Sequence, residues 1–147
     1  MTSSPPSSFP PKRLDLRVIF ETPLRQFAPW LVSVLIVTWA GYPGVVCITP
    51  VAWVIALRVG IMCVTRSISE ESSRRLLEAA LAGALFGLLQ GILFMVIVPF
   101  MGPIKPSEEA NAILLTLILI VGGIFAGAGL SLFTAFLTEG RRNRAIS

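Results

Sequence analysis

The chain has 147 residues, of which 54% are hydrophobic and only 14% are charged. Soluble domains carry about 25% charged residues, so this composition excludes an ordinary soluble domain. The net charge of +4 does not indicate nucleic-acid binding, because the basic residues flank apolar segments instead of alternating with aromatic residues. The sequence therefore predicts a protein that resides in a lipid bilayer.

Residues 1–21 precede the first long apolar segment and form a region of their own. Residues 1–12 are rich in proline and serine and lack the apolar side chains of a core, which predicts disorder. Residues 14–21 alternate apolar and charged side chains, a pattern that fits either a short extended piece or an amphipathic segment on the membrane surface. We expect residues 1–21 to be a disordered or membrane-surface segment.

Two apolar segments follow, each of about the length that crosses a ~30 Å hydrocarbon core. The first, residues 23–40, starts with Pro23 at the first helical position after a threonine cap. The second, residues 45–65, holds Pro50 after another threonine, so its regular helix begins either near residue 45 or only at Pro50. Both segments are predicted to be membrane-spanning helices.

The third predicted span covers residues 69–98 and has the clearest start signal. Ser67 and Glu70 stand at the spacing of a capping box, and Ser69 is a rival cap. The first turns of this helix are rich in Glu and Arg, so we expect them to project out of the lipid into the cytoplasm. The apolar part begins at Ala79.

The fourth predicted span covers residues 108–139 and ends near Gly140, a residue type that commonly terminates helices. The four spans together define a transmembrane domain over residues 22–140. A short basic tail, residues 141–147, follows it.

Basic residues predict the orientation, since cytoplasmic loops carry an excess of Lys and Arg. Three regions would share the cytoplasmic side, and they hold Lys12, Arg13, Arg17, Arg25, Arg66, Arg74, Arg75, Arg141, Arg142 and Arg144. The two opposite connections hold only Lys105. The predicted fold class is thus an all-α integral membrane protein with about four transmembrane helices and both termini in the cytoplasm. The membrane is a bacterial inner membrane or a related energy-transducing membrane.

Small residues recur every four positions on the third and fourth spans. They are Ala79, Gly83, Gly87 and Gly91 on one helix, and Gly123, Gly127, Ser131 and Ala135 on the other. Such ladders let two helices approach closely in lipid, and they predict an antiparallel, glycine-packed hairpin of the third and fourth helices. We favour the register that places Gly87 opposite Gly127. A slip of one turn, with Gly87 opposite Gly123, retains three of the four matches.

Three polar residues fall at membrane depth or at its rim: Arg58, Glu78 and Gln90. Arg58 lies about 12 Å inside the end of its span at ~1.5 Å per residue, and an arginine near the centre of a span costs about 2.5–3.5 kcal/mol. A partner is therefore expected. Glu78 is the best candidate within the chain, and Gln90 lies deeper. The structural interpretation, an ion pair between helices, is favoured over a site for an anionic ligand.

Enzyme signatures are absent from the sequence. It holds no histidine, no phosphate-binding glycine loop, no GxSxG motif and no cluster of metal ligands. We therefore predict that the protein is not an enzyme and has no catalytic residue, metal site or dedicated cofactor, although a bound lipid or pigment is compatible with the sequence.

These features rank three functional hypotheses. The first is a non-catalytic accessory or structural subunit of a larger membrane complex, whose partners are lipids and other integral membrane subunits or further copies of itself. The second is a small homo-oligomeric transporter or channel component in which Arg58 faces a polar cavity. The third is an adaptor whose N-terminal tail recruits a soluble protein. The sequence favours the first hypothesis over the second because its spans hold few polar residues that could line a transport path.

Overall fold

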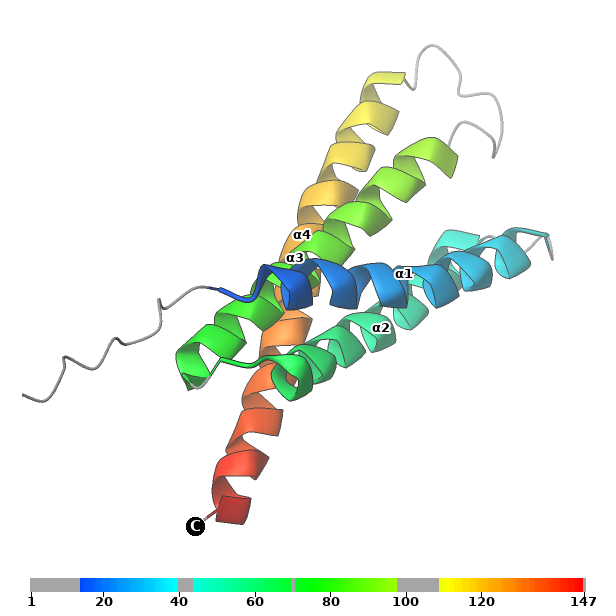
Figure 1. Cartoon of the computed structure of the whole chain (residues 1–147). Coiled ribbons are helices and arrows are strands. Elements are labelled where there is room, and N and C mark those ends of the chain that lie inside the picture. The colour runs from blue at the N-terminus through cyan, green and yellow to red at the C-terminus, as the bar shows by residue number, and fades with distance from the viewer. Residues whose placement is uncertain (1–13, 40–43, 70, 98–108, 147) are drawn as a thin grey trace, which may run out of the picture.

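The computed structural model shows an all-helical chain, which confirms the helical class predicted from the sequence (Figure 1). It describes residues 14–39, 44–69, 71–97 and 109–146, and within these ranges there is no strand. The helices are α1 (Leu16–Trp39), α2 (Gly44–Arg66), α3 (Ser72–Ile97) and α4 (Glu109–Ile146).

Helix α1 begins earlier than predicted, at Leu16, and holds Pro23 in its interior instead of at its start. Asp15 supplies the cap, since its Oδ1 atom accepts a hydrogen bond of 3.3 Å from the backbone N–H of Val18. Residues 16–21 are consequently part of α1 and not a separate extended piece. The remainder of the predicted N-terminal segment, residues 1–13, lies outside the described residues.

Helix α2 begins at Gly44, so the later start at Pro50 is not the one adopted and Pro50 lies inside the helix. Proline lacks an N–H, but one missing hydrogen bond near the first turns of a long helix is tolerated. The helix ends at Arg66, close to the predicted boundary.

Ser67 and Ser69 do not cap α3, which begins later than predicted, and Glu70 of the predicted capping box lies outside the described residues. The helix begins at Ser72, and Glu71 occupies the capping position, because its backbone carbonyl accepts from the N–H of Arg74 at 3.2 Å. Its carboxylate also accepts from the hydroxyl of Ser73 at 2.8 Å. Ser67 instead belongs to the end of α2, where its N–H donates to the carbonyl of Cys63 at 2.8 Å.

Helix α4 continues to Ile146, through Gly140, where the sequence predicted its end. A glycine inside a helix costs about 1 kcal/mol relative to alanine and does not by itself terminate the helix. The arginines that follow, including Arg144 in the last turn, interact favourably with the negative end of the helix dipole. The basic tail is therefore an extension of α4.

The four helices form three layers. Helices α2 and α3 contact each other in the middle, α1 packs on one side of them and α4 on the other. Figure 1 shows that α1 and α2 form one hairpin and α3 and α4 another. The end of α1 and the start of α2 point in a different direction from the end of α3 and the start of α4. The hairpins meet at the opposite end, which we call the polar end and define by Asp15, Ser67 and Glu78.

Helices α3 and α4 touch through glycine backbones, in a register one turn away from the favoured one. A Cβ atom added at Gly83 would collide with the carbonyl oxygen of Gly127, and one added at Gly87 with that of Gly123. Gly91 faces Ile120 instead of a glycine, at 2.8 Å from an added Cβ to Cγ1. The closest contacts thus fit the slipped alternative. Gly83 also lies against Ser131, its partner in the favoured register, at 2.5 Å from an added Cβ to Oγ.

Two hydroxyl groups on α4 attach this helix to α2 as well. Ser131 donates to the backbone carbonyl of Ala56 at 2.8 Å, and Thr134 donates to that of Leu57 at 2.9 Å. Gly60 allows this approach, because an added Cβ there would collide with the Ser131 carbonyl. Ser131 is fully buried and lies where α2, α3 and α4 meet.

The core consists of two apolar clusters. One surrounds Trp30, which is fully buried and packs edge-to-face against Phe86 and Phe94 at ring-centroid distances of 6.1 and 6.2 Å. The second lies nearer the polar end and includes Ala79 and Ala135, both fully buried.

Among the residues that the structure describes, two helical segments are long and apolar enough to cross a membrane: Ser72–Val96 in α3 and Leu117–Arg142 in α4. Only 11% of the apolar window in α4 is buried against the rest of the chain. The outward side of α4 carries the large exposed side chains Leu117, Val121, Phe125, Leu132, Phe133 and Phe136. Apolar surface of this extent requires hydrocarbon or another protein to cover it.

Candidate functional site

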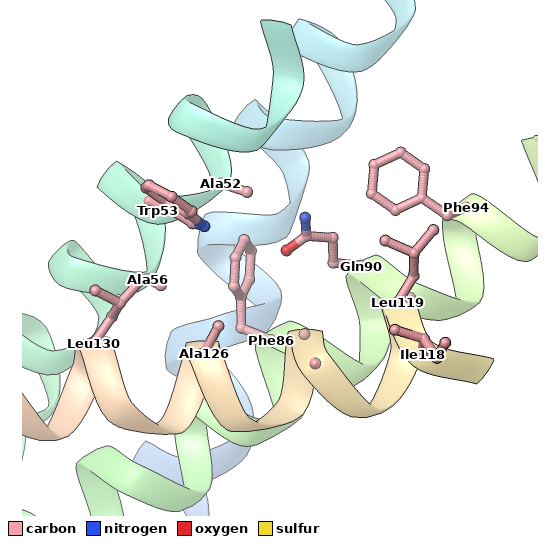
Figure 2. A pocket seen from close by; sticks show the side chains of 14 residues that line it. Ala52, Trp53, Ala56, Phe86, Gln90, Phe94, Ile118, Leu119, Ala126 and Leu130 are labelled. Atoms are coloured by element: carbon pink, nitrogen blue, oxygen red, sulfur yellow. The ribbon is translucent and has the colours of Figure 1, made fainter. Parts of the chain in front are cut away.

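A pocket of about 310 Å³ lies between α2, α3 and α4, on the side where the two hairpins diverge (Figure 2). Its floor is made of residues with little or no side chain, and its walls are aromatic or aliphatic. The lining includes Ala52, Ala56, Gly91, Gly122, Gly123, Ala126 and Gly127 among the small residues, and Trp53, Phe86, Phe94, Ile118, Leu119 and Leu130 among the large ones.

Gln90 supplies the amide group of this pocket. It stands one helical turn from both Phe86 and Phe94, so all three side chains project from the same face of α3. In the view of Figure 2 the Phe86 ring lies between Trp53 on α2 and Gln90 on α3. Within the described residues, Gln90 has no hydrogen-bond partner.

Arg58 lies elsewhere, on the outside of α2. It is exposed, as are Val51, Val54 and Ile61, and the spacing of three and four positions places all four on one face of the helix. Among the described residues no carboxylate forms an ion pair with Arg58. The suggested Arg58–Glu78 pair is therefore not formed.

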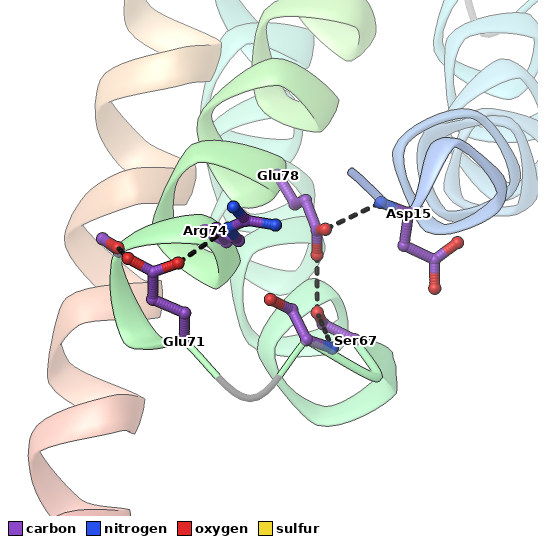
Figure 3. A network of polar contacts seen from close by, with 7 residues as sticks. Asp15, Ser67, Glu71, Arg74 and Glu78 are labelled. Carbon is purple, nitrogen blue, oxygen red and sulfur yellow. Dashed lines mark hydrogen bonds and ion pairs between the residues drawn. The ribbon is translucent and has the colours of Figure 1, made fainter. Parts of the chain in front are cut away.

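Glu78 is instead fully buried at the polar end, where it connects three helices (Figure 3). One carboxylate oxygen accepts a hydrogen bond of 2.8 Å from the backbone N–H of Asp15, at the start of α1. The other accepts one of 2.5 Å from the hydroxyl of Ser67, at the end of α2. Both oxygens are thus satisfied by neighbouring elements, which gives this residue a structural role.

A second buried carboxylate, which the sequence analysis missed, joins α3 to α4. Arg75 donates to Glu139, and their side chains are only 10% and 4% exposed. The two residues are 64 positions apart, so no local pattern connects them. Their placement at the same end of two antiparallel helices is the only signal that could have paired them.

Three arginines surround a shallow hollow at the polar end, beside the start of α1. Arg17, Arg25 and Arg66 line it together with Glu21 and Asp15. The hydrogen bond from Arg17 and the positive charge of Arg25 hold the pKa of Glu21 below its ordinary value. Two of the arginines are thereby engaged by one carboxylate, which leaves the hollow with excess positive charge.

The site therefore has three parts that lie apart from one another: the pocket with Gln90, the outward face with Arg58, and the polar end with Glu78. Within the residues that the structure describes, no group of three or more His, Cys, Asp or Glu side chains is arranged to hold a metal ion. In comparisons with protein-family models, curated proteins and solved structures, none matches this chain.

Proposed function

We propose that the chain is an integral membrane protein with four spans and cytoplasmic termini, and that it serves as a non-catalytic accessory subunit of a larger membrane complex. The proposal places the polar end at the cytoplasmic surface of a bacterial inner or related energy-transducing membrane. Lipid and other integral membrane subunits are its partners.

The lengths and composition of α3 and α4 support membrane insertion. Hydrocarbon tolerates backbone only where its polar groups bond internally, as they do in helices. Transmembrane helices tilt by up to about 40° from the bilayer normal, so two hairpins that diverge at one end can both cross it. The arginines at the polar end, including Arg66, Arg74 and Arg75, support its cytoplasmic placement.

The exposure of Arg58 is the observation that carries the subunit proposal. The residue stands about eight positions, or ~12 Å, before the end of α2, in a row of exposed apolar side chains. An arginine at such depth in lipid is unfavourable unless a polar group accompanies it. Since Glu78 is committed to Asp15 and Ser67, and no other carboxylate among the described residues pairs with Arg58, we propose that another subunit supplies its partner.

The outward face of α4 supports the same conclusion. It is apolar and carries three exposed phenylalanines, Phe125, Phe133 and Phe136. Aromatic side chains are enriched where proteins associate, and this helix offers one broad face on which a larger subunit can pack.

The experiment is gentle solubilisation of the tagged chain from its native membrane, followed by native gel electrophoresis and identification of the proteins that migrate with it. We expect the unaltered chain to migrate with larger, unrelated subunits. The Arg58→Leu variant should be released from them. The matched control is Arg66→Leu, the same substitution at the end of the same helix, and it should remain bound.

A complex that retains Arg58→Leu as well as the control would contradict the role of this residue. Migration of the unaltered chain as a monomer would contradict the accessory function.

The same exposure of Arg58 also favours a second candidate, a homo-oligomeric transporter or channel component in which Arg58 of each copy faces a shared polar cavity. A band that contains only copies of this chain, with Arg58→Leu altering ion or solute flux in reconstituted vesicles, would establish this candidate instead. Without a change in flux, that band would contradict both candidates.

A further inference from the structure

We propose that the pocket between α2, α3 and α4 binds a lipid-soluble ring compound whose carbonyl or hydroxyl group hydrogen-bonds to Gln90. This inference rests on the proposed membrane insertion, but it does not depend on the accessory role. It concerns a different face of the molecule from Arg58.

The shape of the pocket favours a flat, apolar ligand. Gly122 and Gly123 on α4 and Ala52 on α2 leave the floor open, and the space between the helices measures about 310 Å³. Phe86 and Trp53 present aromatic rings to this space (Figure 2). Aromatic rings gain stacking or edge-to-face contacts with a ring compound, which a flexible alkyl chain does not supply.

The chemistry of Gln90 requires a polar group on that ligand. A side-chain amide carries two donors and one acceptor oxygen, and within the described residues Gln90 uses none of them in a hydrogen bond. In hydrocarbon no water is available, so an unsatisfied amide is costly. The indole N–H of Trp53, on the opposite wall, can donate to the same ligand.

The depth of Gln90 narrows the class of ligand. It lies twelve positions beyond Glu78 on α3, or about 18 Å along the helix. With Glu78 at the membrane surface, this position is near the middle of a ~30 Å hydrocarbon core. The ester groups of phospholipids stay at the interface with their headgroups, so they do not reach Gln90. A compound that dissolves entirely in the hydrocarbon can reach Gln90.

The test uses the full chain in phosphatidylcholine nanodiscs and 2-decyl-1,4-benzoquinone as the probe. Quenching of tryptophan fluorescence reports binding, and Trp53→Phe removes the indole that lines the pocket. We expect a saturable component of quenching in the unaltered chain and a smaller one in Trp53→Phe, because Trp30 also packs against the pocket-lining Phe86 and Phe94. Decylbenzene, which has the ring and chain but no carbonyl, should compete at least threefold more weakly than the quinone.

Two glycines on α4 provide a matched pair of variants. An added Cβ meets no atom within 4 Å at either Gly122 or Gly129, but only Gly122 lines the pocket. Gly122→Leu should weaken saturable binding at least tenfold, whereas Gly129→Leu should leave it unchanged. Gln90→Leu should weaken quinone binding roughly threefold to tenfold, the effect of one hydrogen bond, and leave decylbenzene unaffected.

Equal binding by the two glycine variants, or no saturable quenching in the unaltered chain, would overturn the pocket proposal. Flotation of the chain with phosphatidylcholine vesicles separates this failure from failure of the membrane proposal. A chain that floats but does not bind the probe contradicts only the pocket. A chain that remains soluble in buffer without detergent contradicts both.

Discussion

Adding a single methyl group at Gly87 should force α3 and α4 apart. The Cβ of alanine at this position would lie well inside van der Waals distance of the Gly123 carbonyl oxygen, and neither of these backbones can move without breaking the helix that holds it. The opposite contact is looser but still tight, since a Cβ added at Gly123 lies 3.0 Å from the carbonyl oxygen of Gly87. To relieve this clash, α3 and α4 must move apart along the whole hairpin, which also breaks the contact between Gly83 and Gly127.

The size of the effect follows from two opposing terms. Overpacking of a tight contact costs about 1–3 kcal/mol. Replacing glycine by alanine within a helix offsets this by up to about 1 kcal/mol, since alanine is the better helix former. The control Gly129→Ala has only the favourable term, because no atom lies within 4 Å of its added Cβ. The difference between Gly87→Ala and Gly129→Ala therefore isolates the packing term, about 1–3 kcal/mol.

The assay is the free energy of unfolding, measured by titrating dodecyl sulfate into mixed micelles and following helicity by circular dichroism. Gly87→Ala should unfold at lower dodecyl sulfate than the unaltered chain, and Gly129→Ala at an equal or higher fraction. If the two variants unfolded together, the backbone contact between Gly87 and Gly123 would not be present in the protein.

Three further predictions concern the charged groups of the polar end. Arg75→Met should lower the free energy of unfolding by about 3–5 kcal/mol, because it leaves Glu139 buried and unpaired. In a double-mutant cycle, the double variant Arg75→Met with Glu139→Leu should recover most of this loss. Glu78→Ala should cost about 1–3 kcal/mol in the same unfolding assay, since it leaves two half-buried donors, the N–H of Asp15 and the hydroxyl of Ser67, without their acceptor. Glu21→Ala at the surface should cost less, and equal costs would contradict the structural role of Glu78. The pKa of the Glu21 carboxyl, measured by NMR, should lie below its ordinary value of 4.5. The ion pairs of Glu21 should therefore stabilise the chain above pH 4.5 and be lost as the pH falls through the lowered pKa. A pKa at or above 4.5 would exclude these pairs.

The long elements of this fold could be predicted from the sequence because charge and hydrophobicity separate cleanly along the chain. The ends of the helices could not. Pro23 and Pro50 each follow a threonine and read locally as the start of a helix, but both lie in helix interiors. The start of α1 depends on Asp15, whose backbone N–H donates to the carboxylate of Glu78 on α3, 63 residues further along the chain. No window of local sequence contains that interaction.

The register of the α3–α4 hairpin shows a second limit. Ladders with a period of four match themselves almost equally well after a slip of one turn, so small residues alone do not choose between registers. The bonds from Ser131 and Thr134 to the carbonyls of α2 add a constraint that the pairwise match ignores. Gly60, which permits them, ends a run of small residues at four-residue spacing, Ala52, Ala56 and Gly60, which the sequence analysis did not single out.

The distribution of satisfied and unsatisfied polar groups connects the fold to its proposed role. At the polar end, Glu78 has partners for both of its carboxylate oxygens. Arg75 and Glu139 pair with each other, although Nε of Arg75 and Oε2 of Glu139 have no partner among the described residues. Within the described residues of the apolar part, Arg58 and Gln90 have no such partners. One faces outward from α2 and the other faces the pocket, so a single occupant cannot satisfy both. If the outward face holds a subunit and the pocket holds a ligand, Arg58→Leu should abolish assembly without changing probe binding, and Gly122→Leu should do the reverse. Joint loss of both properties in either variant would show that the two faces form one site.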